Sequence, residues 1–369
     1  MRNVIRPWKI LACALLLPLL GGCGKFFPKE TTPPGSSGNY LYVANSSVSN
    51  VAGFSIGTSN LSAVSNSPYS LAVAPSALAA TPSGSYLYAS SLGGAIYGYS
   101  IASNGSLSLL NNGSAVVSQI SPVAIKVDPS GSWLIAVDLT PIAYVFSIDS
   151  STGLLTSEGS VPLDAGTPNR IVFTPNNSLV YVSLGTGGVD ILSFASNTGV
   201  LTKTNQILKP KQTLNADQGL AVDPGSKYLF VAETGLNGLR VLSIASTGAL
   251  TELSGSPYTT ALGPSGVLVD STGSYVYVAN RTANNISGFL LASTGALTQI
   301  SGSPFTTGTN PVDLTEDVTN AYIAAVCSGG TPDLQVFKIS TTTPGALTSF
   351  TTSTTGTDPT GAAAIVSAK

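Results

Sequence analysis

The chain contains no histidine, so any acid–base chemistry has to come from other side chains. Histidine is the side chain that most often transfers protons near neutral pH, and without it a general base would have to be a carboxylate with a raised pKa. A positive group would also be needed to stabilise an oxyanion. Glu233 and Asp138 could supply the base, and Arg281 and Arg170 the positive group. Solvated loop residues, or ion pairs with one another, are the alternative interpretation of these four.

Metal and cofactor sites find little support in the sequence. Histidine is absent, and no two of the three cysteines have the close spacing of a zinc-binding pair. An oxygen-only cation site from Asp138, Glu233, Asn280 and Asn45 is conceivable, but no dense Asp/Asn loop supports it. No glycine-rich phosphate loop precedes a helix. We therefore expect no metal and no cofactor.

The elements that must position these residues come from one phrase that recurs along the chain. Residues 275–280, Tyr-Val-Tyr-Val-Ala-Asn, alternate with a period of two, which is typical of a strand with both faces packed. Related phrases begin at positions 40, 86, 133, 179, 228, 275 and 321, in steps of 46 to 49 residues. A repeat of ~40–50 residues that carries four strands is typical of a β-propeller.

Each repeat contains four strand-like segments. The first, such as Pro122 to Asp128, ends in a turn of the type Asp-Pro-Ser-Gly, and the second is the aromatic phrase. The third and fourth are joined by a hairpin such as Ser246 to Thr251, whose glycine recurs in six repeats. Asn60 takes the place of that glycine in the first repeat, and we expect it to adopt the left-handed backbone conformation that asparagine tolerates.

The two ends of the repeat array predict how the ring closes. The first repeat opens directly on its second strand at Tyr40, and the segment Pro359 to Val366 is a first strand with nothing after it. Joined, they make one blade of three strands plus one, and no strand edge is left free. The sequence therefore predicts an all-β fold, a seven-bladed β-propeller of four-stranded antiparallel blades over residues 39–369.

Residues 1–22 have the pattern of an export signal. Arg2, Arg6 and Lys9 precede an apolar segment of 11 residues, Ile10 to Leu20, which is too short to span a membrane. The sequence Leu-Gly-Gly-Cys at 20–23 resembles the bacterial lipoprotein signal, in which the cysteine becomes the lipidated first residue. An ordinary signal peptide with an incidental cysteine is the alternative.

The resemblance to a lipoprotein signal implies a place in the bacterial cell envelope. Cys23 would carry the lipid, and residues 23–38, rich in Pro, Gly, Ser and Thr, would form a flexible linker. The envelope location would be the outer membrane and periplasm, or the outer face of the cell membrane. Cys327 is then without a disulfide partner, and we expect it to be a small buried side chain.

The charge composition indicates which classes of molecule the chain is expected to bind. Without Arg2, Arg6 and Lys9, 12 basic residues face 17 acidic ones, a formal charge of −5 for the mature chain. No basic stripe is present, so nucleic acid is not an expected partner. Only 9% of residues are charged, and we expect a monomer with a surface of Ser, Thr, Asn and Gly.

The aromatic phrase and the hairpin Thr-Gly-Ala-Leu-Thr resemble the seven-bladed lactonase-like propellers. That family includes propeller 6-phosphogluconolactonases, cycloisomerases of carboxymuconate-type lactones and exported proteins with YVTN-type repeats. The resemblance implies a site at one mouth of the channel, where second strands end and first strands begin. It matches Arg281 to a family arginine and Asp138 partly to a family aspartate. Glu233 lies one residue early for the family glutamate, and Arg170 stands nearest to the missing histidine.

Three functions follow from these patterns. The first is an exported, lipid-anchored binding module that takes a small lactone, a sugar or a protein at the channel mouth. The second is a lactone hydrolase with Arg281 and Arg170 as electrophiles and Glu233 as base. The third is a structural protein of the cell envelope.

Overall fold

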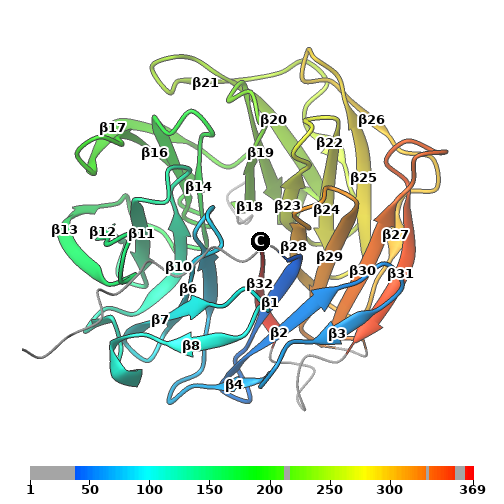
Figure 1. Cartoon of the computed structure of the whole chain (residues 1–369). Coiled ribbons are helices and arrows are strands. Elements are labelled where there is room, and N and C mark those ends of the chain that lie inside the picture. The colour runs from blue at the N-terminus through cyan, green and yellow to red at the C-terminus, as the bar shows by residue number, and fades with distance from the viewer. Residues whose placement is uncertain (1–37, 212–216, 330–331, 354–361) are drawn as a thin grey trace, which may run out of the picture. The chain divides into compact units, whose positions relative to one another are not determined.

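The computed structural model describes residues 38–211, 217–329, 332–353 and 362–369. Within these ranges the strands form seven antiparallel sheets in a ring, which confirms the predicted β-propeller (Figure 1). The helices described there are two short 3₁₀ turns, η1 (Asn111–Gly113) and η2 (Thr234–Leu236). In the described ranges no helix has the length and apolarity that crossing a membrane requires. The predicted signal peptide 1–22, the lipid-attachment residue Cys23 and all of the linker before residue 38 lie outside the described residues.

The blades follow the predicted order of strands, from the centre of the ring outwards. The first strands of blades 1 to 7 are β32 (Ala362–Ala368), β5 (Ala77–Ala80), β10 (Pro122–Val127), β14 (Arg170–Phe173), β18 (Asp217–Val222), β23 (Pro264–Val269) and β28 (Pro311–Glu316). The second strands are β1 (Tyr40–Asn45), β6 (Tyr86–Ser91), β11 (Trp133–Asp138), β15 (Leu179–Ser183), β19 (Tyr228–Glu233), β24 (Tyr275–Asn280) and β29 (Tyr322–Cys327). The third strands are β2 (Asn50–Ile56), β7 (Ala95–Ile101), β12 (Ile142–Ile148), β16 (Val189–Ala195), β20 (Gly238–Ile244), β25 (Asn285–Leu291) and β30 (Leu334–Ile339). The fourth strands are β3 (Leu61–Ala63), β8 (Leu107–Leu109), β13 (Leu155–Pro162), β17 (Val200–Leu208), β21 (Leu250–Glu252), β26 (Leu297–Gln299) and β31 (Leu347–Ser353).

Four blades carry a short fifth strand that the sequence analysis did not predict. Each of these strands pairs with the third strand of its own blade, beyond the end of the fourth. Three of the four begin at the aromatic residue of a recurring Ser-Pro-aromatic sequence, a signal that was present in the chain. The four strands are β4 (Tyr69–Ser70), β9 (Val117–Ser118), β22 (Tyr258–Thr259) and β27 (Phe305–Thr306).

The ring closes as predicted, by pairing the tail of the chain with its first strand. β32 lies antiparallel to β1, with Tyr40 opposite Ala368 and Val43 opposite Ile365 (Figure 1). The innermost strands contact one another around the full circle, and β32 lies between β28 and β5. The predicted closing strand began at Pro359, but residues 354–361 lie outside those described.

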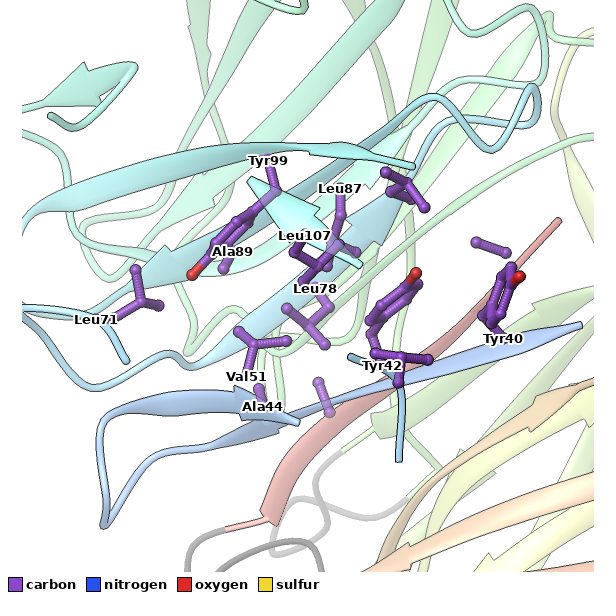
Figure 2. Close-up of a cluster of buried hydrophobic side chains, with 14 residues drawn as sticks. Tyr40, Tyr42, Ala44, Val51, Leu71, Leu78, Leu87, Ala89, Tyr99 and Leu107 are labelled. Carbon is purple, nitrogen blue, oxygen red and sulfur yellow. The ribbon is translucent and has the colours of Figure 1, made fainter. Parts of the chain in front are cut away.

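The seams between blades are small hydrophobic cores. Figure 2 shows the seam between blades 1 and 2, where Tyr42 and Val51 from one blade face Leu87 and Tyr99 from the next. Tyr42 and Leu87 are fully buried, and Tyr99 is nearly so. Burial of apolar area at about 25 cal/mol per Å² makes every such seam a source of stability, so the ring needs no single central core.

In three blades a recurring tyrosine of the second strand, Tyr42, Tyr88 or Tyr277, connects the blade to the hairpin of the next. Buried hydroxyl groups donate to the carbonyl oxygen of the hairpin glycine, as in Tyr42 to Gly105 at 2.7 Å and Tyr277 to Gly345 at 2.8 Å. A Cβ atom at Gly345 would lie 2.5 Å from the Tyr275 ring, and the backbone there has a φ of 76°. Glycine is therefore required at this position for two reasons: the backbone has a positive φ, and the Tyr275 ring leaves no room for a Cβ atom.

The prediction for Asn60 is wrong. Its φ is not among the positive values, whereas the corresponding glycines all have positive φ. The first hairpin closes differently, because the Gly57 N–H donates to the Asn60 carbonyl at 2.9 Å and the Asn60 side chain donates to Ser62 Oγ at 3.1 Å. The asparagine thus stabilises a tighter turn that needs no left-handed residue.

Carboxylates fix the turns between first and second strands. In blade 6, Asp270 Oδ1 accepts the N–H groups of Ser274 at 2.8 Å and Tyr275 at 2.6 Å. Asp128, Asp223 and Asp317 do the same in blades 3, 5 and 7. These acidic residues satisfy backbone donors, which removes them from the set available for chemistry.

Cys327 ends β29 with a side chain that is fully buried. Burial raises the pKa of its thiol from 9.0 to about 11, so the thiolate that would react is scarce at neutral pH. This confirms the predicted role of a small buried side chain.

Candidate functional site

The centre of the ring holds a cavity of about 400 Å³. All seven first strands contribute to its wall, and most of the wall is alanine, glycine, valine, leucine or isoleucine. Small side chains are needed here because neighbouring first strands approach closely: a Cβ atom at Gly219 would lie 2.6 Å from the Ser265 carbonyl oxygen. Among the described lining residues three are charged, Lys126 from β10, Arg170 from β14 and Asp313 from β28.

Arg170 reaches from blade 4 to blade 7 on the other side of the cavity. Its Nη2 donates to the Val312 carbonyl oxygen at 2.9 Å and lies 3.7 Å from Asp313 Oδ1. Its backbone N–H donates to Ser183 Oγ at 3.0 Å, which anchors the start of β14 to the end of β15. The Arg170 side chain is 30% exposed and that of Asp313 is 22% exposed, so both remain open to the cavity.

Asp313 is held in place by backbone donors as well as by Arg170. Its Oδ1 accepts the Leu314 N–H at 3.1 Å, and its Oδ2 accepts the Ile365 N–H of the closing strand at 3.3 Å. The carboxylate therefore links blade 7 to blade 1 and still faces the arginine. The contact distance of 3.7 Å to Arg170 is long for an ion pair with hydrogen bonds, which leaves the arginine able to take another acceptor.

Lys126 adds a second cation. Its side chain is exposed to the cavity, and desolvation within the ring lowers the pKa of the ammonium group from its ordinary value of 10.5. The positive charge of Arg170 acts in the same direction, and the carboxylate of Asp313 opposes it. Among the described residues, none has an atom in hydrogen-bonding contact with the Lys126 ammonium group. The described residues of the cavity wall thus supply two cations and one carboxylate.

The four residues selected from the sequence lie along one edge of the ring, in different environments. This edge, the strand-end rim, is where first strands begin and second strands end: Arg170 pairs with Ser183, and Pro264 with Asn280. Asp138 and Glu233 are the last residues of β11 and β19, and Arg281 follows β24. Only Arg170 lines the cavity.

Glu233 is fully buried, in an ion-pair network within blade 5. Its Oε1 accepts the Lys211 N–H at 2.8 Å, and its Oε2 lies 3.6 Å from Nη1 of Arg240, a residue that is 3% exposed. Arg240 also donates to the Lys209 carbonyl at 3.0 Å and to Glu252 Oε2 at 3.3 Å. The carboxylate is therefore turned toward an arginine of its own blade and does not line the central cavity.

Asp138, the last residue of β11, and Arg281, which follows β24, lie at the strand-end rim. Asp138 is 7% exposed, and its carboxylate accepts the N–H groups of Ser121 at 3.0 Å and Thr140 at 3.3 Å. The side chain of Arg281 is exposed, and its backbone N–H donates to the Gly263 carbonyl at 2.7 Å. Neither residue lines the cavity.

The asparagines of the conceivable cation site are also engaged within their own blades. The Asn280 amide donates to Asn285 Oδ1 at 2.8 Å and to Ser287 Oγ at 2.9 Å, and that of Asn45 donates to Asn50 Oδ1 at 3.0 Å. In the part of the chain that the structure describes, no three acidic or cysteine side chains gather in a group that could hold a metal ion.

The sequence analysis missed two of the three charged residues of the cavity, Lys126 and Asp313. Lys126 is the one charged residue of an otherwise apolar first strand, whereas Asp313 shares its strand with Thr315 and Glu316. Because strands from seven separate blades form the wall, neither strand by itself revealed that the two residues share one cavity with Arg170.

Comparisons with known proteins agree with the fold. The family described as "Lactonase, 7-bladed beta-propeller" matches residues 33–173, 142–264 and 252–364. The chain belongs to this lactonase family. No curated protein sequence matches the chain significantly.

Solved structures of similar shape include other members of the propeller class. A Bacteroides uniformis protein provisionally named a 6-phosphogluconolactonase is 17% identical, with a TM-score of 0.73 over 89% of this chain and 99% of its own. A Lactobacillus plantarum protein is 20% identical, with a TM-score of 0.74 over 90% and 99%. The periplasmic gluconolactonase of Pseudomonas aeruginosa is 14% identical, with a TM-score of 0.74 over 90% and 99%. At these identities the likeness to this lactonase-family chain concerns the fold.

Proposed function

We propose that this lactonase-family propeller is a binding protein whose central cavity takes a small polar ligand with an anionic group. The observation that carries the proposal is the placement of Lys126 and Arg170 in one cavity, where Asp313 is the one carboxylate among the described lining residues. Arginine is charged at every relevant pH, so the site has a positive balance whenever Lys126 is protonated. A volume of about 400 Å³ falls within the ordinary range for small-molecule pockets and suits a sugar-sized ligand.

Binding without turnover is favoured because the expected base is engaged elsewhere. Glu233 is buried against Arg240, and the chain offers no histidine to replace it. We further propose that the protein is exported and held at the cell envelope through a lipid on Cys23, as its first residues predict. Labelling with a fatty-acid analogue in a bacterial host tests this: the label should appear on the full chain and be lost from Cys23→Ser.

Calorimetric titration of the full chain carrying Cys23→Ser tests ligand binding. D-Gluconate and the neutral D-glucono-1,5-lactone are suitable probes, because they differ in charge more than in size. We expect gluconate to bind and Arg170→Gln to weaken it by roughly tenfold, the loss of one charge-assisted hydrogen bond. Arg281→Gln, on the exposed turn, is the matched control. Equal binding by wild type and Arg170→Gln would contradict the proposed site.

Lactone hydrolysis is the second candidate, favoured by membership of the lactonase family and by one observation in the cavity. Lys126 has a lowered pKa, and lysines tuned in this way can act as general bases. Hydrolysis of glucono-1,5-lactone followed by acid release would show turnover. Loss of turnover in Lys126→Met with retention in Glu233→Gln would assign the base to the cavity. Loss in Arg281→Ala would instead support the rim residues and overturn the binding-only proposal.

A further inference from the structure

We propose that Lys126 is a nucleophilic amine that forms an imine with a small aldehyde or ketone carrying an anionic group. The inference rests on the proposed ligand site, since both use the central cavity. It goes further by assigning a covalent step to one atom, Lys126 Nζ, and by naming the carbonyl group as the part of the ligand that reacts.

The first support is the position of the side chain. Lys126 is exposed to the cavity, and within the described residues its ammonium group has no hydrogen-bonding or ion-pair partner. Two other lysines, in contrast, form ion pairs: Lys203 contacts Asp164, and Lys211 contacts Glu252 at 2.9 Å. The ammonium group of Lys126 is therefore free to contact a ligand that enters the cavity.

The second support is the neighbouring cation. Lysine becomes a nucleophile when it is desolvated or lies beside another positive group, because both favour the neutral amine. Lys126 meets both conditions, because desolvation acts on its ammonium group and Arg170 lies in the same cavity. These two effects lower the pKa of Lys126, and Asp313 moderates the shift.

The third support is a place for the anionic group of the ligand. A guanidinium group has five N–H donors, and the contacts of Arg170 within the described residues use only Nη2. Its remaining donors can bind a carboxylate while the carbonyl carbon of the same ligand lies toward blade 3 and Lys126. Asp313 restricts where the anionic group of the ligand can lie, because its carboxylate repels an anion close to blade 7.

The proposed step balances without an oxidant or reductant. The neutral amine of Lys126 attacks the carbonyl carbon, a C–N bond forms, and the carbonyl π electrons pass to the oxygen. The amine nitrogen loses one proton and the oxygen gains one, which gives a carbinolamine. Protonation of that hydroxyl group releases water as the nitrogen lone pair forms the C=N bond. The product is an iminium ion, and hydrolysis restores the lysine and the carbonyl compound.

Reductive trapping tests the inference. The full chain with Cys23→Ser is incubated with glyoxylate, an anionic aldehyde, and sodium cyanoborohydride near pH 7, and modified lysines are mapped by peptide mass spectrometry. Lys338, exposed on β30, is the internal reference. We expect faster modification of Lys126 than of Lys338, because the lowered pKa leaves a larger fraction of the Lys126 amine neutral near pH 7. Glycolaldehyde, which is neutral, should show a smaller preference for Lys126.

Variants of Asp313 and Arg170 separate the effects of these two charges on the reactivity of Lys126. Asp313→Asn should increase the rate at Lys126, and Arg170→Gln should decrease it and remove the preference for glyoxylate over glycolaldehyde. Circular dichroism spectra establish that each variant is folded, and the unchanged rate at Lys338 serves as control. Modification of Lys126 no faster than that of Lys338, in a protein that still binds gluconate, would overturn this inference and leave the proposed function intact. Failure of both binding and trapping would overturn the site itself.

Discussion

Removal of Arg240 should destabilise the protein far more than removal of any exposed charge. The fully buried Glu233 has Arg240 Nη1 at 3.6 Å from its Oε2, and that oxygen accepts no hydrogen bond in the described structure. Arg240→Met would leave this oxygen buried without a cation. Breaking a buried pair from one side costs about 3–5 kcal/mol, because the remaining charge is uncompensated.

Substitution of Glu233, the partner of Arg240, should destabilise the protein less. Glu233→Gln keeps an oxygen that can accept the Lys211 N–H, and Arg240 still has Glu252 at 3.3 Å. We expect a loss of about 1–3 kcal/mol, the range for one buried polar group left poorly paired. The double variant Glu233→Met with Arg240→Met should recover most of the loss, because it leaves no buried charge.

Urea denaturation followed by circular dichroism measures these differences. A loss of 3–5 kcal/mol with a slope of about 3 kcal/mol per M corresponds to a midpoint lower by roughly 1–1.7 M. Glu158→Gln, an exposed glutamate on β13, is the matched control and should stay within about 0.5 kcal/mol. Equal midpoints for Arg240→Met and Glu158→Gln would refute the reasoning. Loss of lactone turnover in Glu233→Gln at unchanged stability would show that Glu233 is a catalytic base after all.

Three further outcomes follow from the fold. Gly345→Ala should lower the stability measured by thermal unfolding more than Gly113→Ala does. Both glycines have a positive φ, a conformation that costs alanine about 1–2 kcal/mol. Only at Gly345 would the new Cβ atom also meet an aromatic ring, which adds about 1–3 kcal/mol. Deletion of residues 362–369 should give aggregates in size-exclusion chromatography, because β1 loses its partner, whereas deletion of the exposed Lys369 alone should leave a single species. Burial raises the pKa of Glu316 above 4.5, so the native state holds that proton to a higher pH than the unfolded state, and stability from this group is lost as pH rises. Glu316→Gln should therefore raise the melting temperature at pH 7 and lose that advantage near pH 4; a gain that is the same at both pH values would contradict this assignment.

The sequence by itself determined the ring. Seven aromatic phrases at nearly constant spacing, the recurrent hairpin glycine and the unpaired first strand at the tail predicted the blades and their closure, because local strand periodicity and turn chemistry repeat in every unit. Tyr277 and Gly345 illustrate the reason: each residue type is required by contacts that recur at the same position of each repeat.

Only the tertiary structure decided which charges face one another. Lys126, Arg170 and Asp313 belong to three different blades, and Asp313 is 187 positions from Lys126 (313 minus 126), so no local pattern connects them. The same holds for Glu233, whose strand-end position is visible in the sequence but whose burial against Arg240 depends on how β19 and β20 pair. Repeats reveal what is common to the blades, whereas a site depends on the residues in which single blades differ.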